Sequence, residues 1–241
     1  MSEKRLSRSI LVALLLCNVV VYGQTVSFEF LSWDDQQYVV KNLERFGGRL
    51  DAASVRWSIT NQEHGWRTPI SHLSLFLDAQ VYGVKSWGMH LTNSLIHSCS
   101  TVLLFFVMRK MTGKAIASGI AAAIFAVHPL HVEPVAWVTG RWDLLCGFFW
   151  IAGMGAYVNH LQRKTLSSYL CLLILFLFAL WSKPTALTFP FCLLLLDLWP
   201  LNRIRFSTSA EPDRDDSKLD CLVSPGRAIL EKAPLFGIMG V

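Results

Sequence analysis

Apolar runs separated by short polar stretches constrain the fold of this chain more than any other feature. Six runs of this kind cover residues 10–22, 88–108, 115–127, 144–158, 169–181 and 185–199. Only 16% of the residues are charged, against about 25% in soluble domains. The sequence therefore predicts an all-α fold, a polytopic integral membrane helix bundle with about six spans and the start of a seventh.

Several runs are shorter than the roughly 20 residues with which a helix crosses a bilayer. The runs 169–181 and 185–199 are separated by a break at 182–184, so a helical hairpin that does not cross fully is an alternative to two spans. The first run follows three basic residues, a pattern that it shares with signal peptides. We expect it to be retained, because a helix there gives a consistent topology.

Basic residues mark alternate ends of the runs. Four clusters share this position: Lys4/Arg5/Arg8, Arg109/Lys110/Lys114, Arg163/Lys164 and Arg203/Arg205. With the N-terminus in the cytoplasm, all four fall on the cytoplasmic side, as the positive-inside rule requires. The loop 24–87, the stretch 128–143 and Lys183 then lie at the outer face. The net charge of +5 comes from span ends and not from one patch, so we expect no nucleic-acid partner.

Three regions differ in composition. Residues 1–206 form the predicted membrane domain with its outer loop 24–87, and residues 207–226 form a polar cytoplasmic linker. Residues 227–241 turn apolar again and predict the start of a further membrane segment, as in a truncated chain. Most of the 6 cysteines lie in or near apolar runs and none form a CxxC pair, so neither a disulfide framework nor a cysteine metal site is predicted.

Two adjacent acidic residues, Asp34 and Asp35, follow the first apolar run at the outer face. A carboxylate in this position has the chemistry to deprotonate an acceptor hydroxyl or to hold a divalent cation. A solvated acidic turn, or a cap for a helix over 36–43, explains the same residues without catalysis.

Five ionisable side chains crowd into the stretch between the third and fourth apolar runs. They are His128, His131, Glu133, Arg141 and Asp143. Ionisable groups at such depth usually line a polar cavity, and Pro129 and Pro134 favour helix breaks that expose backbone groups to a ligand. The histidine spacing matches no strong zinc motif, so we assign no metal.

Three of the basic residues at the predicted outer face, Arg67, Arg141 and Lys183, are candidates to meet an anion. The planar fork of Arg141 suits a phosphate or pyrophosphate, and an ion pair with Glu133 is the structural alternative. Arg67 and Lys183 either meet an anionic head group or snorkel to the membrane interface. If the three cations converge on the acidic pair, they form a site for an anionic donor.

Five blocks in fixed order resemble a known family. They are Trp66-Arg67-Thr68-Pro69, residues 87–97, residues 128–137, residues 140–145 and Ser182-Lys183-Pro184. With an acidic pair in the first outer loop, they resemble the membrane part of the transmembrane-and-tetratricopeptide-repeat O-mannosyltransferases and their bacterial relatives. That family belongs to the GT-C superfamily of membrane glycosyltransferases, which use polyprenyl-phosphate sugars. The resemblance covers residues 10–205.

This resemblance implies transfer of a sugar, mannose, from a polyprenyl-phosphate donor to a Ser/Thr hydroxyl of an acceptor protein. Membrane lipid, the lipid-linked sugar and the acceptor protein are the implied partners, at the periplasmic face of a bacterial inner membrane or in the endoplasmic reticulum lumen. Asp34 or Asp35 is the implied catalytic base, and Arg67, Arg141 and Lys183 are candidates for donor-phosphate contacts. The residues expected to line the site are His128, His131, Glu133 and Asp143. The donor is a substrate, no further cofactor is assigned, and a divalent cation stays open.

Two departures from the family pattern matter. The family carries more spans and then helical repeats, and this chain ends before either. At Pro184, animal members tend to have an acidic residue. Two other classes of function stay open: a non-catalytic membrane anchor of a repeat-containing interaction protein, and a transporter with the charged outer stretch as its gate. No inverted repeat in the sequence supports the transporter.

Overall fold

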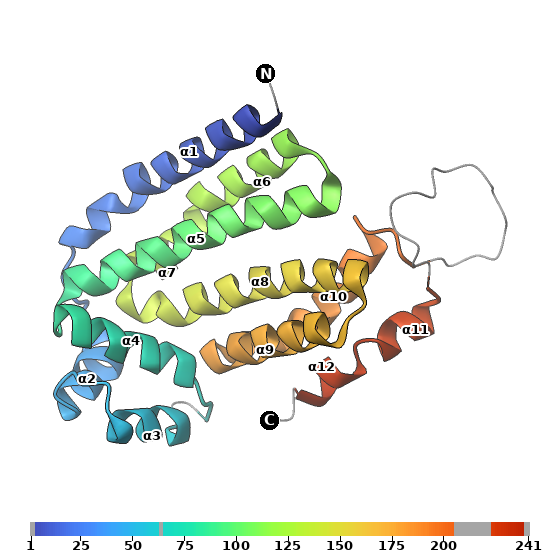
Figure 1. Ribbon diagram of the computed structural model, residues 1–241. Helices are drawn as coiled ribbons and strands as arrows, with labels where there is room; N and C mark the ends of the chain where they lie inside the picture. Colours follow the sequence, from blue (N-terminus) through green and yellow to red (C-terminus); the bar gives the residue numbers. More distant parts are fainter. Residues whose placement is uncertain (1–2, 63–64, 205–222, 239–241) are drawn as a thin grey trace, which may run out of the picture.

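Long helices run side by side through the computed structural model, which describes residues 3–62, 65–204 and 223–238 (Figure 1). In spatial order they are α1 (Glu3–Tyr22), α6 (Ala115–Val127), α5 (Ser86–Thr112), α8 (Arg141–Arg163) and α9 (Leu166–Ser182). A shorter helix, α10 (Phe189–Leu198), follows α9. The described ranges contain no strand, and an isolated bridge pairs Ile204 with Val223. The predicted all-α class is confirmed.

All six predicted apolar runs are helical for most of their length. Of the described residues, three segments are long and apolar enough to cross a membrane: Glu3–Ser27, Ser86–Thr112 and Val138–Arg163. Helix α6 and the segment Pro129–Ala136 make a fourth if this pair, bent by 51°, counts as one span. Leu166–Ser182 and Pro184–Leu198 are apolar but shorter. The number of six spans therefore stays a prediction.

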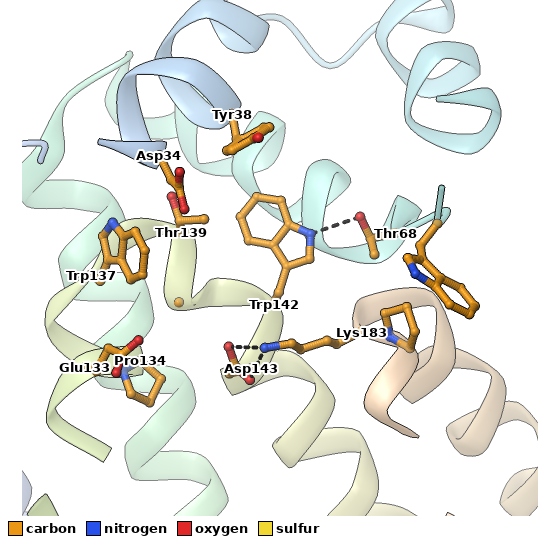
Figure 2. Close-up of a pocket in the computed structure, with 13 residues that line it drawn as sticks. Asp34, Tyr38, Thr68, Glu133, Pro134, Trp137, Thr139, Trp142, Asp143 and Lys183 are labelled. Atoms are coloured by element: carbon orange, nitrogen blue, oxygen red, sulfur yellow. Dashed lines mark hydrogen bonds and ion pairs between the residues drawn. The ribbon is translucent and has the colours of Figure 1, made fainter. Parts of the chain in front are cut away.

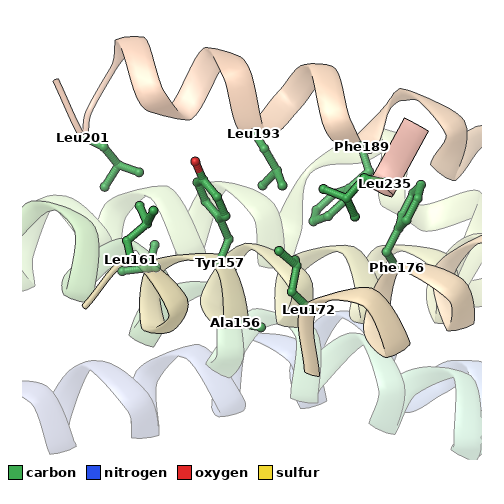
Figure 3. Close-up of a cluster of buried hydrophobic side chains, with 10 residues drawn as sticks. Ala156, Tyr157, Leu161, Leu172, Phe176, Phe189, Leu193, Leu201 and Leu235 are labelled. Carbon is green, nitrogen blue, oxygen red and sulfur yellow. The ribbon is translucent and has the colours of Figure 1, made fainter. Parts of the chain in front are cut away.

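Helices α8, α9 and α10 share an apolar core (Figure 3). Tyr157 of α8 and Phe176 of α9 are buried there with Phe189 and Leu193 of α10. Gly153 allows α10 to approach α8, because a Cβ on this residue would lie 2.8 Å from Phe189 Cζ. Lipid tails are as apolar as these side chains, so close packing is what holds such helices together.

The run of small residues in α6 has the same effect on the other side of the bundle. Ser118, Gly119 and Ala122 are buried in α6. A Cβ on Gly119 would lie 3.0 Å from Ile10 Cγ2 of α1, so the absence of a side chain allows α1 to pack closely.

The segment predicted as an outer loop folds into short helices. They are a 3-10 helix (Gly23–Ser27), a π-helix (Asp35–Val40), α2 (Lys41–Arg45), α3 (Ala52–Thr60) and α4 (Pro69–Tyr82). Val39, Leu43, Leu75 and Phe76 from these helices bury a small core against Met89 of α5. This core fixes the segment against one end of the bundle.

The predicted basic clusters lie together at the opposite end of the bundle. The start of α1, the α5–α6 turn and the α8–α9 turn all reach this end, which we call the basic end (Figure 1). Arg109 of α5 donates to Ser7 Oγ of α1 at 2.7 Å, and Lys110 of α5 contacts Asn159 of α8. Arg205 lies outside the described residues. Which membrane face the basic end occupies stays a prediction.

Only one of the two prolines in the connection between α6 and α8 marks a helix break. The connection consists of a 3-10 helix (Pro129–His131), α7 (Val132–Ala136) and a second 3-10 helix (Val138–Gly140). The break expected at Pro129 is present, since α6 ends at Val127. The break expected at Pro134 is not, because this proline occupies the first turn of α7, where no intrahelical N–H bond is lost.

Two short helices end the described chain. They are α11 (Pro225–Leu230) and α12 (Ala233–Ile238), and Leu235 of α12 is buried beside α9. Most of the predicted linker 207–226 lies outside the described residues. The prediction that 227–241 begins a membrane segment is not decided by helices of this length.

Candidate functional site

A cavity of about 330 Å³ lies at the end of the bundle opposite the basic end (Figure 2). The residues around it come from the π-helix region, the segment before α4, the α6–α8 connection, the first turn of α8 and the segment after α9. They are Asp34, Tyr38, Trp66, Thr68, Glu133, Pro134, Trp137, Thr139, Gly140, Trp142, Asp143, Lys183 and Pro184. Four of the predicted site residues meet here. They are Asp34, Glu133, Asp143 and Lys183.

Asp34 and Asp35 have different surroundings although they are adjacent. Asp34 is half-buried at the cavity wall. Asp35 is completely buried behind that wall, and its Oδ1 accepts hydrogen bonds from the backbone N–H of Thr139 at 2.9 Å and from Thr139 Oγ1 at 2.6 Å. Its Oδ2 accepts from the Leu31 N–H at 3.0 Å. These contacts tie the segment around Asp34 to the 3-10 helix before α8.

Each of the two non-catalytic explanations for the acidic pair fails for one of its residues. A solvated turn does not fit, because Asp35 is shielded from solvent. A helix cap does not fit Asp34, because its side chain makes no capping hydrogen bond to the π-helix that it precedes.

Lys183 brings a positive charge to the cavity. Its Nζ lies 2.6 Å and 2.7 Å from the two carboxylate oxygens of Asp143. The pair is accessible, with 34% of the Lys183 side chain and 48% of the Asp143 side chain exposed. An ion pair this open to solvent is weak, so an incoming anion can compete with Asp143 for Lys183.

Aromatic side chains form much of the cavity wall. Trp66, Trp137, Trp142 and Tyr38 line the cavity together with Asp34 and the Lys183–Asp143 pair. Trp142 is held in place by a hydrogen bond from its Nε1 to Thr68 Oγ1 at 2.9 Å. The sequence reasoning did not name these residues as site residues, although all three tryptophans lie in the blocks that carry the family resemblance.

A second cavity, of about 470 Å³, adjoins the first. The two share Glu133, Pro134, Asp143 and Lys183. The rest of its wall is mainly apolar or aromatic and consists of His97, Ser100, Phe125, Leu130, His131, Leu144 and Gly147. His131 therefore lines this second cavity and not the first, with its Nδ1 2.6 Å from the Phe125 carbonyl.

Arg141 is fully buried and its charge is already paired. Its Nη2 lies 2.7 Å from Asp78 Oδ2 and donates to the Met89 carbonyl at 2.9 Å, while Nε contacts Asn93. An ion pair between Arg141 and Glu133 is the structural alternative that the sequence suggests. The structure pairs the guanidinium with Asp78 instead. Arg141 lines neither cavity, so the geometry gives it the role of joining α4, α5 and α8.

Two other predicted site residues lie outside both cavities. Arg67 is exposed between the lining residues Trp66 and Thr68. His128 accepts a hydrogen bond from the Leu130 N–H at 3.2 Å and caps the 3-10 helix Pro129–His131. Among the described residues, no three His, Cys, Asp or Glu side chains are grouped to hold a metal ion.

Gly140 allows a close backbone contact in the wall of the first cavity. A Cβ at this position would lie 2.3 Å from the Pro134 carbonyl oxygen. The 3-10 helix that carries Thr139 can therefore lie against α7 only with glycine at position 140.

The sequence matches one family model, described as Dolichyl-phosphate-mannose-protein mannosyltransferase, over residues 67–210. This segment includes most of both cavities but not Asp34. No solved structure matches the chain significantly.

Curated relatives carry the same activity in their names. Protein O-mannosyl-transferase Tmtc1 of Drosophila melanogaster is 31% identical over 175 residues, which are 70% of this chain and 20% of the relative. Protein O-mannosyl-transferase TMTC1 of Homo sapiens is 28% identical over 226 residues, 85% of this chain and 24% of the relative. The chain thus spans about a fifth to a quarter of the length of these relatives.

Proposed function

This chain belongs to the dolichyl-phosphate-mannose-protein mannosyltransferase family, and we propose on that premise that it forms the membrane part of a protein O-mannosyltransferase. Its apolar helices and its family make it a multi-pass membrane protein. The proposed reaction moves mannose from a polyprenyl-phosphate donor to a Ser or Thr hydroxyl of an acceptor protein. The proposed face is the outer one, lumenal or periplasmic, because the cavity lies opposite the basic end.

One observation carries this proposal: the first cavity holds an accessible carboxylate, Asp34, and an accessible cation, Lys183, with aromatic walls between them. In the proposed step, the acceptor oxygen bonds to C1 of mannose as the bond from C1 to the phosphate oxygen breaks. The hydroxyl proton passes to the Asp34 carboxylate. The electron pair of the broken bond stays on the phosphate, where Lys183 offsets the developing charge.

The second cavity supports a route for the donor. It meets the first cavity at Lys183 and has apolar residues such as Phe125, Leu130 and Leu144 along its wall. In the proposal, the prenyl chain lies along this wall and the phosphate lies at Lys183. The sugar then reaches the first cavity, whose tryptophans offer flat apolar surfaces to a sugar ring or an acceptor peptide.

The test of Asp34 is transfer from labelled polyprenyl-phosphate mannose to a Ser/Thr-containing protein, with the 241-residue chain and with a longer, repeat-containing form. We expect Asp34→Asn to lower transfer by about 10²- to 10⁴-fold, the usual contribution of a general base. The matched control is Glu44→Gln, an exposed carboxylate of α2 outside the cavity. Normal transfer by Asp34→Asn, or equal losses in both variants, contradicts the assignment.

The test of Lys183 is donor capture, which can be measured even where transfer is slow. We expect Lys183→Gln to bind a photoreactive polyprenyl-phosphate mannose about tenfold more weakly, because a charge-assisted contact to phosphate is lost. Lys85→Gln removes an exposed lysine just before α5 and is the control. Unchanged capture by Lys183→Gln excludes the proposed phosphate contact.

A further inference from the structure

A second polar centre lies at the basic end of the bundle. A cavity of about 410 Å³ is formed there by the last turns of α8, the first turns of α9, Arg203 and the α11–α12 segment. Helix α8 has 23 residues and is therefore about 34 Å long. Asp143 near its start lines the first cavity and His160 near its end lines this one, so the two cavities are separated by most of a bilayer thickness.

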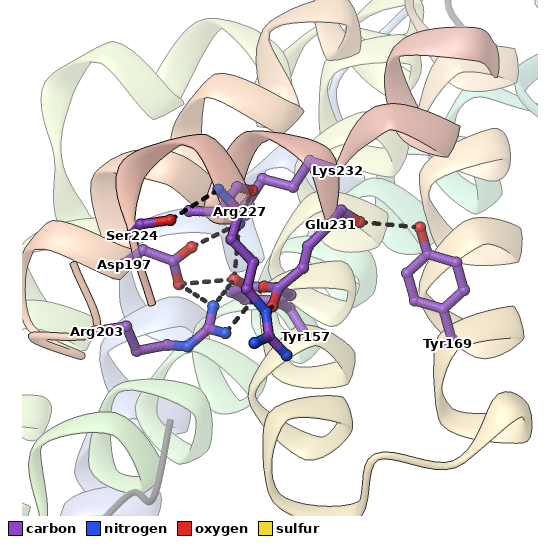
Figure 4. A network of polar contacts seen from close by, with 9 residues as sticks. Tyr157, Tyr169, Asp197, Arg203, Ser224, Arg227, Glu231 and Lys232 are labelled. Atoms are coloured by element: carbon purple, nitrogen blue, oxygen red, sulfur yellow. Dashed lines mark hydrogen bonds and ion pairs between the residues drawn. The ribbon is translucent and has the colours of Figure 1, made fainter. Parts of the chain in front are cut away.

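The inner wall of this cavity is a buried network with balanced charge (Figure 4). Asp197 accepts hydrogen bonds from Tyr157 at 2.6 Å, from Arg203 at 2.8 Å and from Lys232 at 2.5 Å. Glu231 accepts from the other terminal nitrogen of Arg203 at 2.9 Å. Two carboxylates thus face two cations, and this network needs no external ion.

The outer part of the same cavity carries surplus positive charge. Lys164 and Arg227 both line it and both are exposed. Arg227 lies 3.7 Å from Glu231, whose carboxylate already accepts from Arg203, and 73% of its side chain is exposed. Glu231 is the one carboxylate among the lining residues that the structure describes. With His160 neutral, Lys164 and Arg227 leave a surplus of two positive charges.

Two further observations favour an anion attached to an apolar group. Arg203 is 3% exposed, and its Nε has no hydrogen-bond partner within the described chain. The cavity also has an apolar side, formed by Leu161, Leu172, Val223 and Leu235. A fully hydrated ion gains nothing from such a wall, whereas the glycerol and first methylene groups of a lipid do.

We propose that this cavity binds the phosphate of an anionic glycerophospholipid, with Lys164 and Arg227 as its principal contacts. The charge of a phosphate headgroup, one or two negative charges, matches the surplus of the cavity. The site is independent of the Asp34 cavity, so either proposal can fail without the other. A bound lipid there anchors the α8–α9 turn to α11 at the membrane interface.

The experiment measures binding of dihexanoyl phosphatidic acid, a soluble phosphate-bearing lipid, to the purified chain in neutral detergent by native mass spectrometry. Dihexanoyl phosphatidylcholine and inorganic phosphate are the comparison probes. We expect the double variant Lys164→Gln/Arg227→Gln to bind phosphatidic acid about tenfold more weakly. Lys114→Gln/Arg8→Gln is the matched control, because it removes the same two residue types from exposed positions at the same end of the bundle.

Each result decides the proposal. Saturable binding of phosphatidic acid that only the cavity variant weakens supports it, and failure of inorganic phosphate to compete assigns the lipid as the source. Competition by inorganic phosphate at similar concentration assigns the site to free phosphate and overturns the lipid assignment. Absence of binding, or equal weakening by both double variants, overturns the site, since diffuse surface charge then accounts for the data.

Discussion

Adjacent residues of the same type have different tasks in this protein because their side chains leave a helical turn in different directions. Asp34 points to the cavity, while Asp35 is buried and accepts three hydrogen bonds. The same contrast separates two predicted phosphate contacts. Lys183 is accessible in the cavity, whereas Arg141 is buried and paired with Asp78.

The burial of Asp35 leads to a prediction about stability. Asp35→Asn should lower the free energy of unfolding by about 1–3 kcal/mol, because the amide keeps one oxygen for the two donors of Thr139 but places an N–H group against the Leu31 N–H, which requires an acceptor. Transfer should fall with it, since Asp34 loses its support. Asp34→Asn should keep the unfolding midpoint of the unsubstituted chain, measured by thermal unfolding in detergent. Equal midpoints for the two variants would show that Asp35 is not the anchor.

Short helices, rather than the long ones, position the site. Asp34 immediately precedes the π-helix Asp35–Val40, and the 3-10 helix Val138–Gly140 carries Thr139. Each is too short to be stable alone, so side-chain contacts between them decide where they lie. Helix α3 illustrates the same point: Asp51 caps it by accepting from the N–H groups of Ala53 and Ser54 at 2.9 Å.

The Asp51 cap predicts a pH dependence of α3. The hydrogen bond from the Ser54 N–H, the largest influence, holds the pKa of Asp51 below its ordinary value. A lowered folded-state pKa stabilises the helix above the unfolded-state pKa, and this stability is lost as the pH falls through the folded-state pKa. Hydrogen-exchange protection of 52–60 should therefore fall as the pH is lowered from about 5, just above the ordinary aspartate pKa of about 3.9, to about 2.

Asp51→Asn is the control for that experiment. Asparagine is also a good helix cap but does not titrate in this range. Protection in this variant should change little over the same pH interval. An equal fall in both proteins would mean that another group controls α3.

At the scale of the whole molecule, one buried ion pair joins three helices. Arg141 of α8 reaches Asp78 of α4 and both Met89 and Asn93 of α5. The end of the bundle that holds the Asp34 cavity is therefore fixed from within, while the basic end is fixed by the separate network around Asp197.

Removing one partner of the Arg141–Asp78 ion pair should strongly destabilise the folded protein. Asp78→Ala should lower the free energy of unfolding by about 3–5 kcal/mol, because it leaves a buried guanidinium without its counter-ion. Asp143→Ala breaks an exposed pair and should cost about 0–1 kcal/mol. Denaturant titration of both variants in the same detergent makes the comparison. Similar losses would contradict the different burial of the two pairs.

The sequence alone determined the helical class, the apolar segments and the family. Hydrophobic patterning and the basic residues at helix ends are properties of short segments, so they are readable without a fold. The blocks around Trp66, Trp137 and Lys183 likewise indicated the region of the site, because residues that form one cavity can be recognised as an ordered set.

Only the tertiary structure decided which polar residues meet. Arg141, His128 and Arg67 have the same chemistry in the sequence as residues that line the cavities, yet burial against Asp78, a capping hydrogen bond and exposure outside the cavity separate them. Burial and partner choice depend on helices far apart in the chain. The residue type determines which interactions a side chain can make, and packing determines which partners lie within its reach.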